Sequence, residues 1–339
     1  MSPLNAGAAR KLKLASLFTG IGGFDLGFHR TGAFEITLQC EIDRFCTRVL
    51  ENAWPTVGRF ADIKKVKSAD IPVSDLWVAG FPCQDVSVAR MGPRAGLGGA
   101  RSGLFHEFAR LLGECRPGVF ILENVPGLLS SHKGRDFQVV VRTLADLGYS
   151  VGWRMLNSKN FGVAQSRQRV YIVGCYREAK GPFEILFEPE CSEGNVTSGK
   201  QDGATALSPF KEVLGNTVKG PVFQRIAYCL YACSARHTGT DWSRTYVTYP
   251  DGRVRRLTPR ECEIVQGFPE GWTLVEGGSI DQDRLDSLRY QALGNAVTVN
   301  VAEWLARRVL RYFILQRPAS QTALEPTLRK RSAFQEIAV

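Results

Sequence analysis

Short apolar, β-rich runs alternate with amphipathic helical stretches over the first 176 residues of the chain. Alternation of this kind predicts βαβ units and a mostly parallel sheet, whose ligands bind at the carboxyl ends of the strands. We therefore expect functional residues directly after the strands. The expected strands are Leu12–Phe18, Ile36–Cys40, Leu76–Phe81, Val119–Leu122, Val151–Leu156 and Val170–Cys175, and the expected helices include Phe105–Cys115 and Phe137–Leu147.

The pattern changes after residue 180. Residues 181–254 are rich in Gly, Ser, Thr and Asn and lack the βαβ rhythm, which predicts a small irregular domain or a long insertion. Helical patterning returns at Thr258–Gln266 and at Val299–Leu315. The chain is therefore expected to contain a main α/β domain at 1–180, the irregular domain at 181–254, a return to the main domain at 255–315 and a mobile tail at 316–339.

Charge adds a candidate partner to this picture. The chain has 339 residues of ordinary globular composition, with 43 Lys and Arg against 33 Asp and Glu, and a net charge of +10. Such a surplus favours an anionic partner such as nucleic acid or a membrane surface, although a merely basic enzyme has the same surplus. Arginines concentrate between Arg236 and Arg260, and the guanidinium fork suits phosphate oxygens and guanine edges.

Cysteine and histidine positions predict no metal site. Nine cysteines are scattered without a framework, and Leu12–Phe18 is too short an apolar run for a signal peptide, so we expect reduced cysteines in a cytoplasm. Cys229 and Cys233 have the spacing of one helix face, and the four histidines form no ligand motif. No apolar run in the sequence approaches the roughly 18 residues that span a bilayer.

A glycine-rich turn, Phe18–Phe24, follows the first strand. Glycines there let a ligand approach the backbone, but Asp25 stands where a dinucleotide fingerprint needs glycine or alanine, which disfavours a nicotinamide oxidoreductase. Glu41 ends the next strand, where a carboxylate can accept hydrogen bonds from both hydroxyls of a ribose. Asp62-Ile63 offers a carboxylate for an adenine amine and an aliphatic face for its ring. A lone glycine-rich turn is often only a tight loop, but the three features together are more specific.

Reactive side chains follow later strands. Cys83 lies on a loop shaped by Gly80 and Pro82, where a thiolate is placed to attack, although a buried structural cysteine is the common alternative. Glu123 ends the neighbouring strand and is expected near Cys83, unless it is a solvated loop residue.

Two arginines, Arg167 and Arg169, precede the strand expected at Val170–Cys175. In an extended chain, residues two apart point the same way, so these two guanidinium groups could clamp an anion or the polar edge of a base. The alternative is a pair of surface arginines.

In this order along the chain, the motifs resemble those of the DNA (cytosine-5) methyltransferases, over roughly residues 12–176 and 254–315. The segments that carry the resemblance are Phe18–Gly23 (cofactor loop), Gly80–Gln84 (nucleophile), Glu123–Val125 (acid), Gln165–Arg169 (arginine motif), Arg256–Glu261 (return from the target-recognition region) and Gln291–Val297 (beside the cofactor loop). Ile42 and Val86 stand where the family often has aromatic residues, which affects contacts rather than chemistry.

The resemblance implies an α/β, Rossmann-like S-adenosylmethionine-dependent methyltransferase fold with a target-recognition domain at 181–254. It implies methyl transfer from S-adenosylmethionine to ring carbon 5 of cytosine in a specific duplex DNA sequence, after base flipping. Cys83 would add to ring carbon 6, and Glu123 would hydrogen-bond or protonate ring nitrogen 3. Arg169 would bind the cytosine carbonyl oxygen and Arg167 would support it or a phosphate, while backbone around Phe81 would accept from the exocyclic amine.

The resemblance also implies two sets of binding residues. Those expected at the cofactor are Phe18, Gly20, Gly22, Gly23, Glu41, Ile42, Asp62, Ile63, Leu104, Asn295 and Ala296. Those expected at the DNA are Ser87, Arg236, His237, Thr238, Thr240, Arg244 and Thr245, beside a glycine-rich loop at 92–99 that would close over it. We expect a monomer that binds double-stranded DNA, without metal or membrane, in a bacterial cytoplasm at the nucleoid.

Two alternatives remain open at the level of the sequence. A related enzyme acting on cytosine in tRNA shares much of this motif set, and a retired methyltransferase fold would bind nucleic acid without catalysis. The length of the recognition region and the arginine cluster favour duplex DNA, whereas the recognised DNA sequence is not readable from the chain.

Overall fold

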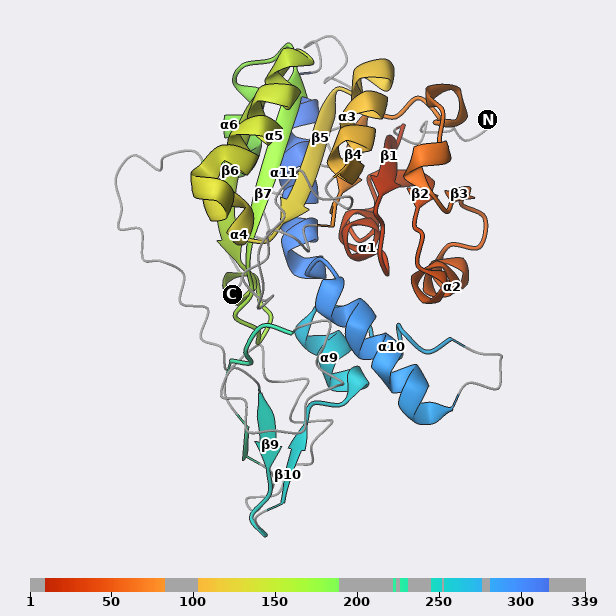
Figure 1. The fold of residues 1–339 in the computed structure, drawn as a ribbon, viewed down its shortest axis with the longest axis vertical. Helices are drawn as coiled ribbons and strands as arrows, with labels where there is room; N and C mark the ends of the chain where they lie inside the picture. The colour runs from red at the N-terminus through yellow and green to blue at the C-terminus, as the bar shows by residue number, and fades with distance from the viewer. Residues whose placement is uncertain are drawn as a thin grey trace, which may run out of the picture.

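One large sheet organises the protein. The computed structural model describes residues 10–82, 103–188, 222–223, 226–230, 245–251, 253–275 and 281–316. Within them, seven strands form a sheet in the order β3-β2-β1-β4-β5-β7-β6 (Figure 1). The strands are β1 Leu12–Leu17, β2 Phe34–Cys40, β3 Arg59–Phe60, β4 Leu76–Ala79, β5 Val119–Asn124, β6 Tyr149–Asn157 and β7 Gln168–Tyr176.

The predicted mostly parallel sheet is confirmed. β1 pairs in parallel with β2 and β4, β2 with β3, and β4 with β5. β7 runs antiparallel to both of its neighbours, β5 and β6. Only residues 158–167 join β6 to β7, too few for the helical crossover that a parallel pair needs. All six predicted strands are present in this sheet, and its two-residue strand β3 was not predicted, nor were the strands of a second, smaller sheet.

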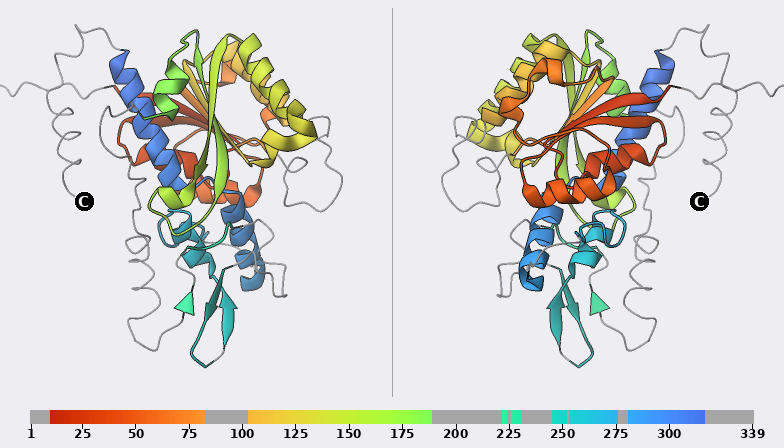
Figure 2. Two further views of the ribbon diagram at one scale, coloured as in Figure 1. Left: turned by 90° about the vertical axis from the view of Figure 1, so that its left-hand side faces the viewer. Right: turned by 90° about the vertical axis from the view of Figure 1, so that its right-hand side faces the viewer.

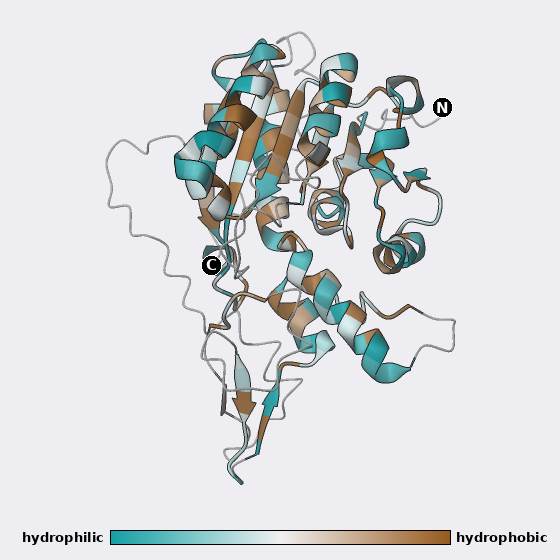
Figure 3. Ribbon diagram, in the orientation of Figure 1, coloured by the Kyte–Doolittle hydropathy of each residue, from teal (hydrophilic) through white to brown (hydrophobic). Residues whose placement is uncertain are grey.

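Helices cover both faces of the sheet (Figure 2). Helices α3 Gly103–Cys115 and α5 Arg135–Asp146 bury apolar side chains on one face, and α1 Gly23–His29, α6 Gly181–Leu186 and α11 Val299–Leu315 do so on the other. The central strands are apolar and the outward helix faces are polar (Figure 3), as expected for strands buried on both sides. The other helical elements of this part are α2 Arg44–Ala53, η1 Ile63–Lys65, η2 Ser68–Asp70, α4 Gly127–Ser130, η4 Ser131–Gly134 and η5 Ser158–Asn160.

Helix α6 packs as part of the main domain, although the sequence pattern predicts that this domain ends at residue 180. Ile185 and Leu186 are fully buried in the same cluster as strands β5 and β7 and helix α11. A Cβ atom at Gly181 would lie 2.5 Å from the sulfur of Cys175 on β7, so this helix begins in direct contact with the sheet. The main domain therefore continues at least to residue 186.

A smaller lobe lies below the carboxyl ends of the parallel strands (Figure 1). It holds the antiparallel sheet β10-β9-β8 and helices α9 and α10. Helix α10 was not predicted, because its buried positions include Arg289 and few apolar residues, which hides the helical period. The bounds are β8 Val222–Phe223, β9 Tyr246–Thr248, β10 Val254–Arg256, α9 Pro259–Val265 and α10 Gln282–Asn295. The tail predicted at 316–339 lies outside the described residues except for residue 316.

Asp25 ties the start of α1 to two strands. Its carboxylate is fully buried and accepts hydrogen bonds from the Ser16 hydroxyl at 2.8 Å and from Gln39 Nε2 at 2.8 Å. Burial raises the pKa of Asp25 from 3.8 to about 6, against the opposing effect of these hydrogen bonds. The residue that breaks the dinucleotide fingerprint is therefore a structural anchor of the turn before it.

This anchor predicts a pH-dependent stability. Between the unfolded pKa of 3.8 and the folded pKa of about 6, the folded state binds more protons, so the free energy of unfolding falls as the pH rises. Asp25→Asn removes the titrating carboxyl, so the stability of the variant relative to the parent should rise by about 2 kcal/mol between pH 4 and pH 7. Urea unfolding at a series of pH values measures it. Asp283→Asn, at an exposed position in the first turn of α10, is the control, and a pH-independent difference for Asp25→Asn would contradict the account.

Candidate active site

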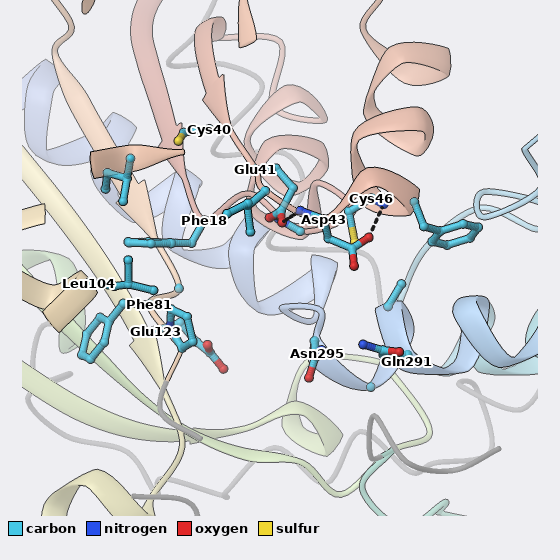
Figure 4. A pocket seen from close by; sticks show the side chains of 18 of the residues that line it. Phe18, Cys40, Glu41, Asp43, Cys46, Phe81, Leu104, Glu123, Gln291 and Asn295 are labelled. Atoms are coloured by element: carbon cyan, nitrogen blue, oxygen red, sulfur yellow. Dashed lines mark hydrogen bonds between the residues drawn. The ribbon is translucent and has the colours of Figure 1, made fainter. Parts of the chain in front are cut away.

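A cavity of about 420 Å³ opens where the carboxyl ends of β1, β2, β4 and β5 face helix α10 (Figure 4). Phe18 follows β1, Glu41 follows β2, and Glu123 lies near the end of β5. Asn295, at the end of α10, closes the opposite side. The volume lies in the range of small-molecule sites. Four strand ends therefore bring distant sequence motifs to one cavity.

The turn after β1 is built around left-handed backbone. Phe18 has φ of 54°, which costs a non-glycine residue about 1–3 kcal/mol, and such strain clusters at functional sites. Gly20 has φ of 58°, and a Cβ atom there would face open space. The Gly20 N–H donates to Glu41 Oε2 at 2.6 Å, so the turn is held against the end of β2.

Gly22 and Gly23 are closely packed on the side where a Cβ atom would lie, and their contacts with a cofactor stay a prediction. A Cβ atom on Gly22 would lie 2.6 Å from the Trp54 ring, and one on Gly23 would lie 2.3 Å from the Val297 carbonyl oxygen. Neither glycine lines the cavity, and nor does Ala296, which is buried beside Val297. The absence of a side chain at Gly22 and Gly23 thus lets the Trp54 ring and the Val297 backbone approach the turn closely.

The acidic side of the cavity carries the other expected cofactor residues. Glu41 Oε1 accepts from the Asp43 N–H at 2.8 Å, and burial raises the pKa of Glu41. Ile42 is 72% exposed and lies at the cavity, whereas Ile63 is buried and lines it from the core. Asp62 also lines the cavity and caps η1 by accepting from Lys64 N. Leu104, at the start of α3, completes the set.

Glu123 and Arg169 form a buried ion pair at the other end. Arg169 Nε lies 2.9 Å from Glu123 Oε1, and both side chains are almost entirely buried. Burial raises the pKa of Glu123, and the charges of Arg169 and then Arg167 oppose that rise. The carboxyl therefore binds a proton more readily than an exposed glutamate does.

Asn124 was missed by the sequence analysis as a site residue in its own right. Its Nδ2 donates to the Phe81 carbonyl oxygen at 3.2 Å, and its Oδ1 accepts from the Val125 N–H at 2.8 Å. Asn124 thus holds the backbone of Phe81 and Pro82 immediately before Cys83. The Phe81 carbonyl, expected to meet a cytosine amine, already accepts this hydrogen bond.

Arg167 connects separate segments of the chain through hydrogen bonds inside the protein. It is only 2% exposed, and its guanidinium donates to the carbonyls of Leu230, Gly294 and Ala296 at 2.9–3.0 Å. The side chains of Arg167 and Arg169 do lie close together, as their spacing predicts, because both contact the sulfur of Cys229. However, Arg167 donates to main-chain carbonyls inside the protein, so the structure gives it no orientation toward a phosphate.

One contact to the cofactor turn comes from far along the chain. Trp272, which precedes α10, donates from Nε1 to the Ile21 carbonyl oxygen at 2.9 Å and packs edge-on against Trp54. The motif order offers no signal for it, because the two partners are 251 positions apart in sequence.

Several predicted site residues lie outside the described part of the chain. They are Cys83, Ser87, the loop 92–99, Arg236, His237, Thr238, Thr240 and Arg244. Cys83 follows Pro82 directly, and Pro82 lines the cavity. Thr245 is described, and its hydroxyl accepts from the Tyr228 N–H at 2.8 Å.

Neither a metal-binding cluster nor a membrane span is found in the part of the chain that the structure describes. No group of three or more His, Cys, Asp or Glu side chains within the described ranges could hold a metal ion. No helix in that part of the chain has the length and apolar character to cross a bilayer.

Comparison with known proteins finds a matching family model, related sequences and solved structures with the same fold. The family model described as "C-5 cytosine-specific DNA methylase" matches residues 12–201 and 215–311. The chain is 31% identical over 328 residues to the Type II methyltransferase M1.ScrFI of Lactococcus lactis subsp. cremoris, covering 91% of this chain and 81% of that protein. It is 32% identical over 321 residues to the Type II methyltransferase M.DsaV of Dactylococcopsis salina, covering 90% and 88%. The solved S. pombe Dnmt2 methyltransferase has the same fold, with a TM-score of 0.64 at 18% identity, covering 89% of this chain and 99% of that one.

The ion pair predicts a shift in the titration of Glu123. Arg169 opposes the effect of burial more than any other group, so Arg169→Gln should raise the pKa of Glu123 further. NMR of protein with ¹³C-labelled glutamate carboxyls measures this pKa, and Glu123→Gln identifies the signal. Arg154 lies on the edge strand β6 and forms an ion pair with Glu188, so Arg154→Gln is the matched control. An unchanged Glu123 pKa in Arg169→Gln would contradict the assignment.

Proposed function

This chain belongs to the C-5 cytosine-specific DNA methylase family and is a DNA (cytosine-5) methyltransferase, and on that premise we propose that it methylates a flipped cytosine through a Cys83 adduct with S-adenosylmethionine as methyl donor. The observation that carries the proposal is the single cavity that joins the glycine turn and Glu41 to Glu123 and Arg169. One end has the residues for a nucleoside, and the other has an acid and a cation for a base edge.

The residues of the first end fit S-adenosylmethionine. Glu41 would accept from the ribose hydroxyls, and the open space over Gly20 leaves room beside it. Asp62 would accept from the adenine amine, with Ile42 and Ile63 against the ring. Phe18, Leu104 and Asn295 line the path toward Glu123. When bound there, the cofactor supplies an electrophilic methyl group.

The residues of the second end would activate the base. The Cys83 thiolate attacks ring carbon 6, while Glu123 donates its proton or a hydrogen bond to ring nitrogen 3, which makes carbon 5 nucleophilic. General acid help of this kind contributes about 10²–10⁴-fold. Arg169, held by Glu123, would donate to the cytosine carbonyl oxygen. Carbon 5 would then take the methyl group, with the neutral thioether of the donor as leaving group, and a base would remove the proton on carbon 5 as the Cys83 thiolate leaves carbon 6.

The cavity requires the base to leave the duplex. Stacked cytosine cannot present carbons 5 and 6 to residues at the ends of buried strands, so flipping would be needed, at a cost of a few kcal/mol. Ser87 and the glycine-rich loop 92–99 would act on the displaced strand, and Arg236, Thr238, Thr240 and Arg244 would read or position the DNA. A single chain holds both ends of the cavity, which supports action as a monomer.

The covalent step predicts a trapped adduct. Duplex DNA containing 5-fluorocytosine in the recognised sequence should become covalently linked to the parent protein in the presence of S-adenosylmethionine, because fluorine cannot leave as a proton does. Cys83→Ala should give no adduct and no 5-methylcytosine while DNA binding persists, and Glu123→Gln should slow adduct formation about 10²–10⁴-fold. Denaturing gels and mass spectrometry of nucleosides measure both.

Cys115→Ala is the control, because this half-buried cysteine lies on α3, outside the cavity lining. Bisulfite sequencing of DNA from cells that express the protein supplies the recognised sequence for these substrates. An adduct that forms equally well with Cys83→Ala, or methyl transfer to tRNA instead of duplex DNA, would overturn the proposal.

DNA binding should depend steeply on salt. Each neutralised phosphate releases a counterion, so the logarithm of the affinity falls with the logarithm of salt with a slope of about −0.9 per phosphate on duplex DNA. Fluorescence anisotropy with a labelled duplex, between about 50 and 200 mM salt, should show a loss of more than about tenfold. A flat response would count against a phosphate-contacting surface.

A further inference from the structure

The strap, residues 226–230, connects the recognition region to the arginine motif. The Ala227 N–H donates to the Ala164 carbonyl at 2.8 Å, and the Ser166 N–H donates to the Ala227 carbonyl at 2.8 Å. The Leu230 N–H donates to Gln165 Oε1 at 3.1 Å. The strap therefore lies alongside the residues that immediately precede Arg167.

The strap also contacts both guanidinium groups. Cys229 Sγ lies 3.5 Å from Arg167 Nη1 and 4.0 Å from Arg169 Nη1. The Leu230 carbonyl accepts from the same Arg167 Nη1 at 3.0 Å. A thiol sulfur is a weak but polarisable acceptor, and here two cations share it. Among the described residues Arg169 has three polar contacts: Glu123, the carbonyl of the preceding residue Gln168, which accepts from the same Nη1 at 2.7 Å, and this sulfur.

The other side of the strap is tied to the small sheet. The Tyr228 N–H donates to the hydroxyl of Thr245, which directly precedes β9. β9 in turn pairs with β8 and β10. A displacement of the small sheet would therefore be transmitted by hydrogen bonds to the strap, and by the strap to the arginines.

From these contacts we propose that Cys229 is a positioning residue, whose sulfur orients Arg169 toward Glu123 and couples the seating of the small sheet to the assembly of the base-activating site. The inference rests on the proposed function, in which Arg169 and Glu123 hold the cytosine. Cys229 itself touches neither substrate nor cofactor in this scheme.

Loss of the sulfur has two consequences. Arg169 loses an acceptor and samples orientations away from Glu123 and from the cytosine oxygen. Because Arg169 is the foremost influence that opposes the rise of the Glu123 pKa, its displacement raises that pKa further. Arg167 and Tyr171 also face Glu123, and their positions are held by other contacts.

The test compares Cys229→Ala, Cys229→Val and Cys229→Ser with the parent. Alanine and valine provide no acceptor, valine keeps the volume of the side chain, and serine keeps an acceptor. We expect the single-turnover rate of 5-fluorocytosine adduct formation to fall about fivefold in the first two variants, because the long contacts from the sulfur to two charged groups are lost, and to recover largely in the third. Affinities for duplex DNA and S-adenosylmethionine should stay within about twofold of the parent.

The pH profile separates positioning from a merely structural role. The rate of adduct formation should fall at high pH, where Glu123 loses its proton. This fall should occur at a higher pH in Cys229→Ala and Cys229→Val than in the parent, and at the parental pH in Cys115→Ala. Parental rates and profile in both acceptor-free variants would overturn the inference. So would an equal loss in Cys229→Ser, or a loss that appears as weaker DNA binding instead of slower attack. If the parent itself forms no adduct, the proposed function fails, whatever the variants do.

Discussion

A carboxylate kept out of water next to a guanidinium is the interaction on which the rest of the site depends. Removal of Glu123 from water favours its neutral form, and Arg169 at 2.9 Å favours its ionised form. The two effects oppose each other, and the pKa of Glu123 is raised because the effect of burial is the larger one. A small displacement of the arginine therefore changes how readily the acid gives up its proton. Much of the surrounding structure serves to hold these two side chains in place.

That positioning uses buried hydrogen bonds from three distant parts of the chain. Arg167 draws together the strap and the end of α10 through main-chain carbonyls, and Asn124 fixes the backbone that leads to Cys83. A buried guanidinium is tolerated when most of its N–H groups find acceptors, and for Arg167 these acceptors are carbonyls of the strap and of the end of α10. The ion pair and the loop before the nucleophile are thereby parts of one hydrogen-bonded unit.

The cofactor end of the cavity is held by close packing. Gly22 and Gly23 leave no space for side chains, since Trp54 and the Val297 backbone occupy it, and Asp25 anchors the helix that follows. Trp272 adds a hydrogen bond from the smaller lobe to the Ile21 carbonyl. The turn that would meet S-adenosylmethionine and the lobe that would meet DNA are therefore in direct contact, next to one shared cavity.

The sequence by itself determined six strands of the large sheet, helices α3, α5, α9 and α11, the parallel character of the sheet and the motifs at the strand ends, because each depends on apolar periodicity or on turn chemistry within a few residues. It also determined that Glu41 and Glu123 would face one edge, since parallel strands end together. Only the tertiary structure decided that Arg167 binds carbonyls rather than solvent, that Gly23 serves packing, and that β7 runs antiparallel. These properties depend on partners such as Leu230 and Val297, which lie far away in sequence. No local pattern encodes such contacts, because packing of the whole chain creates them.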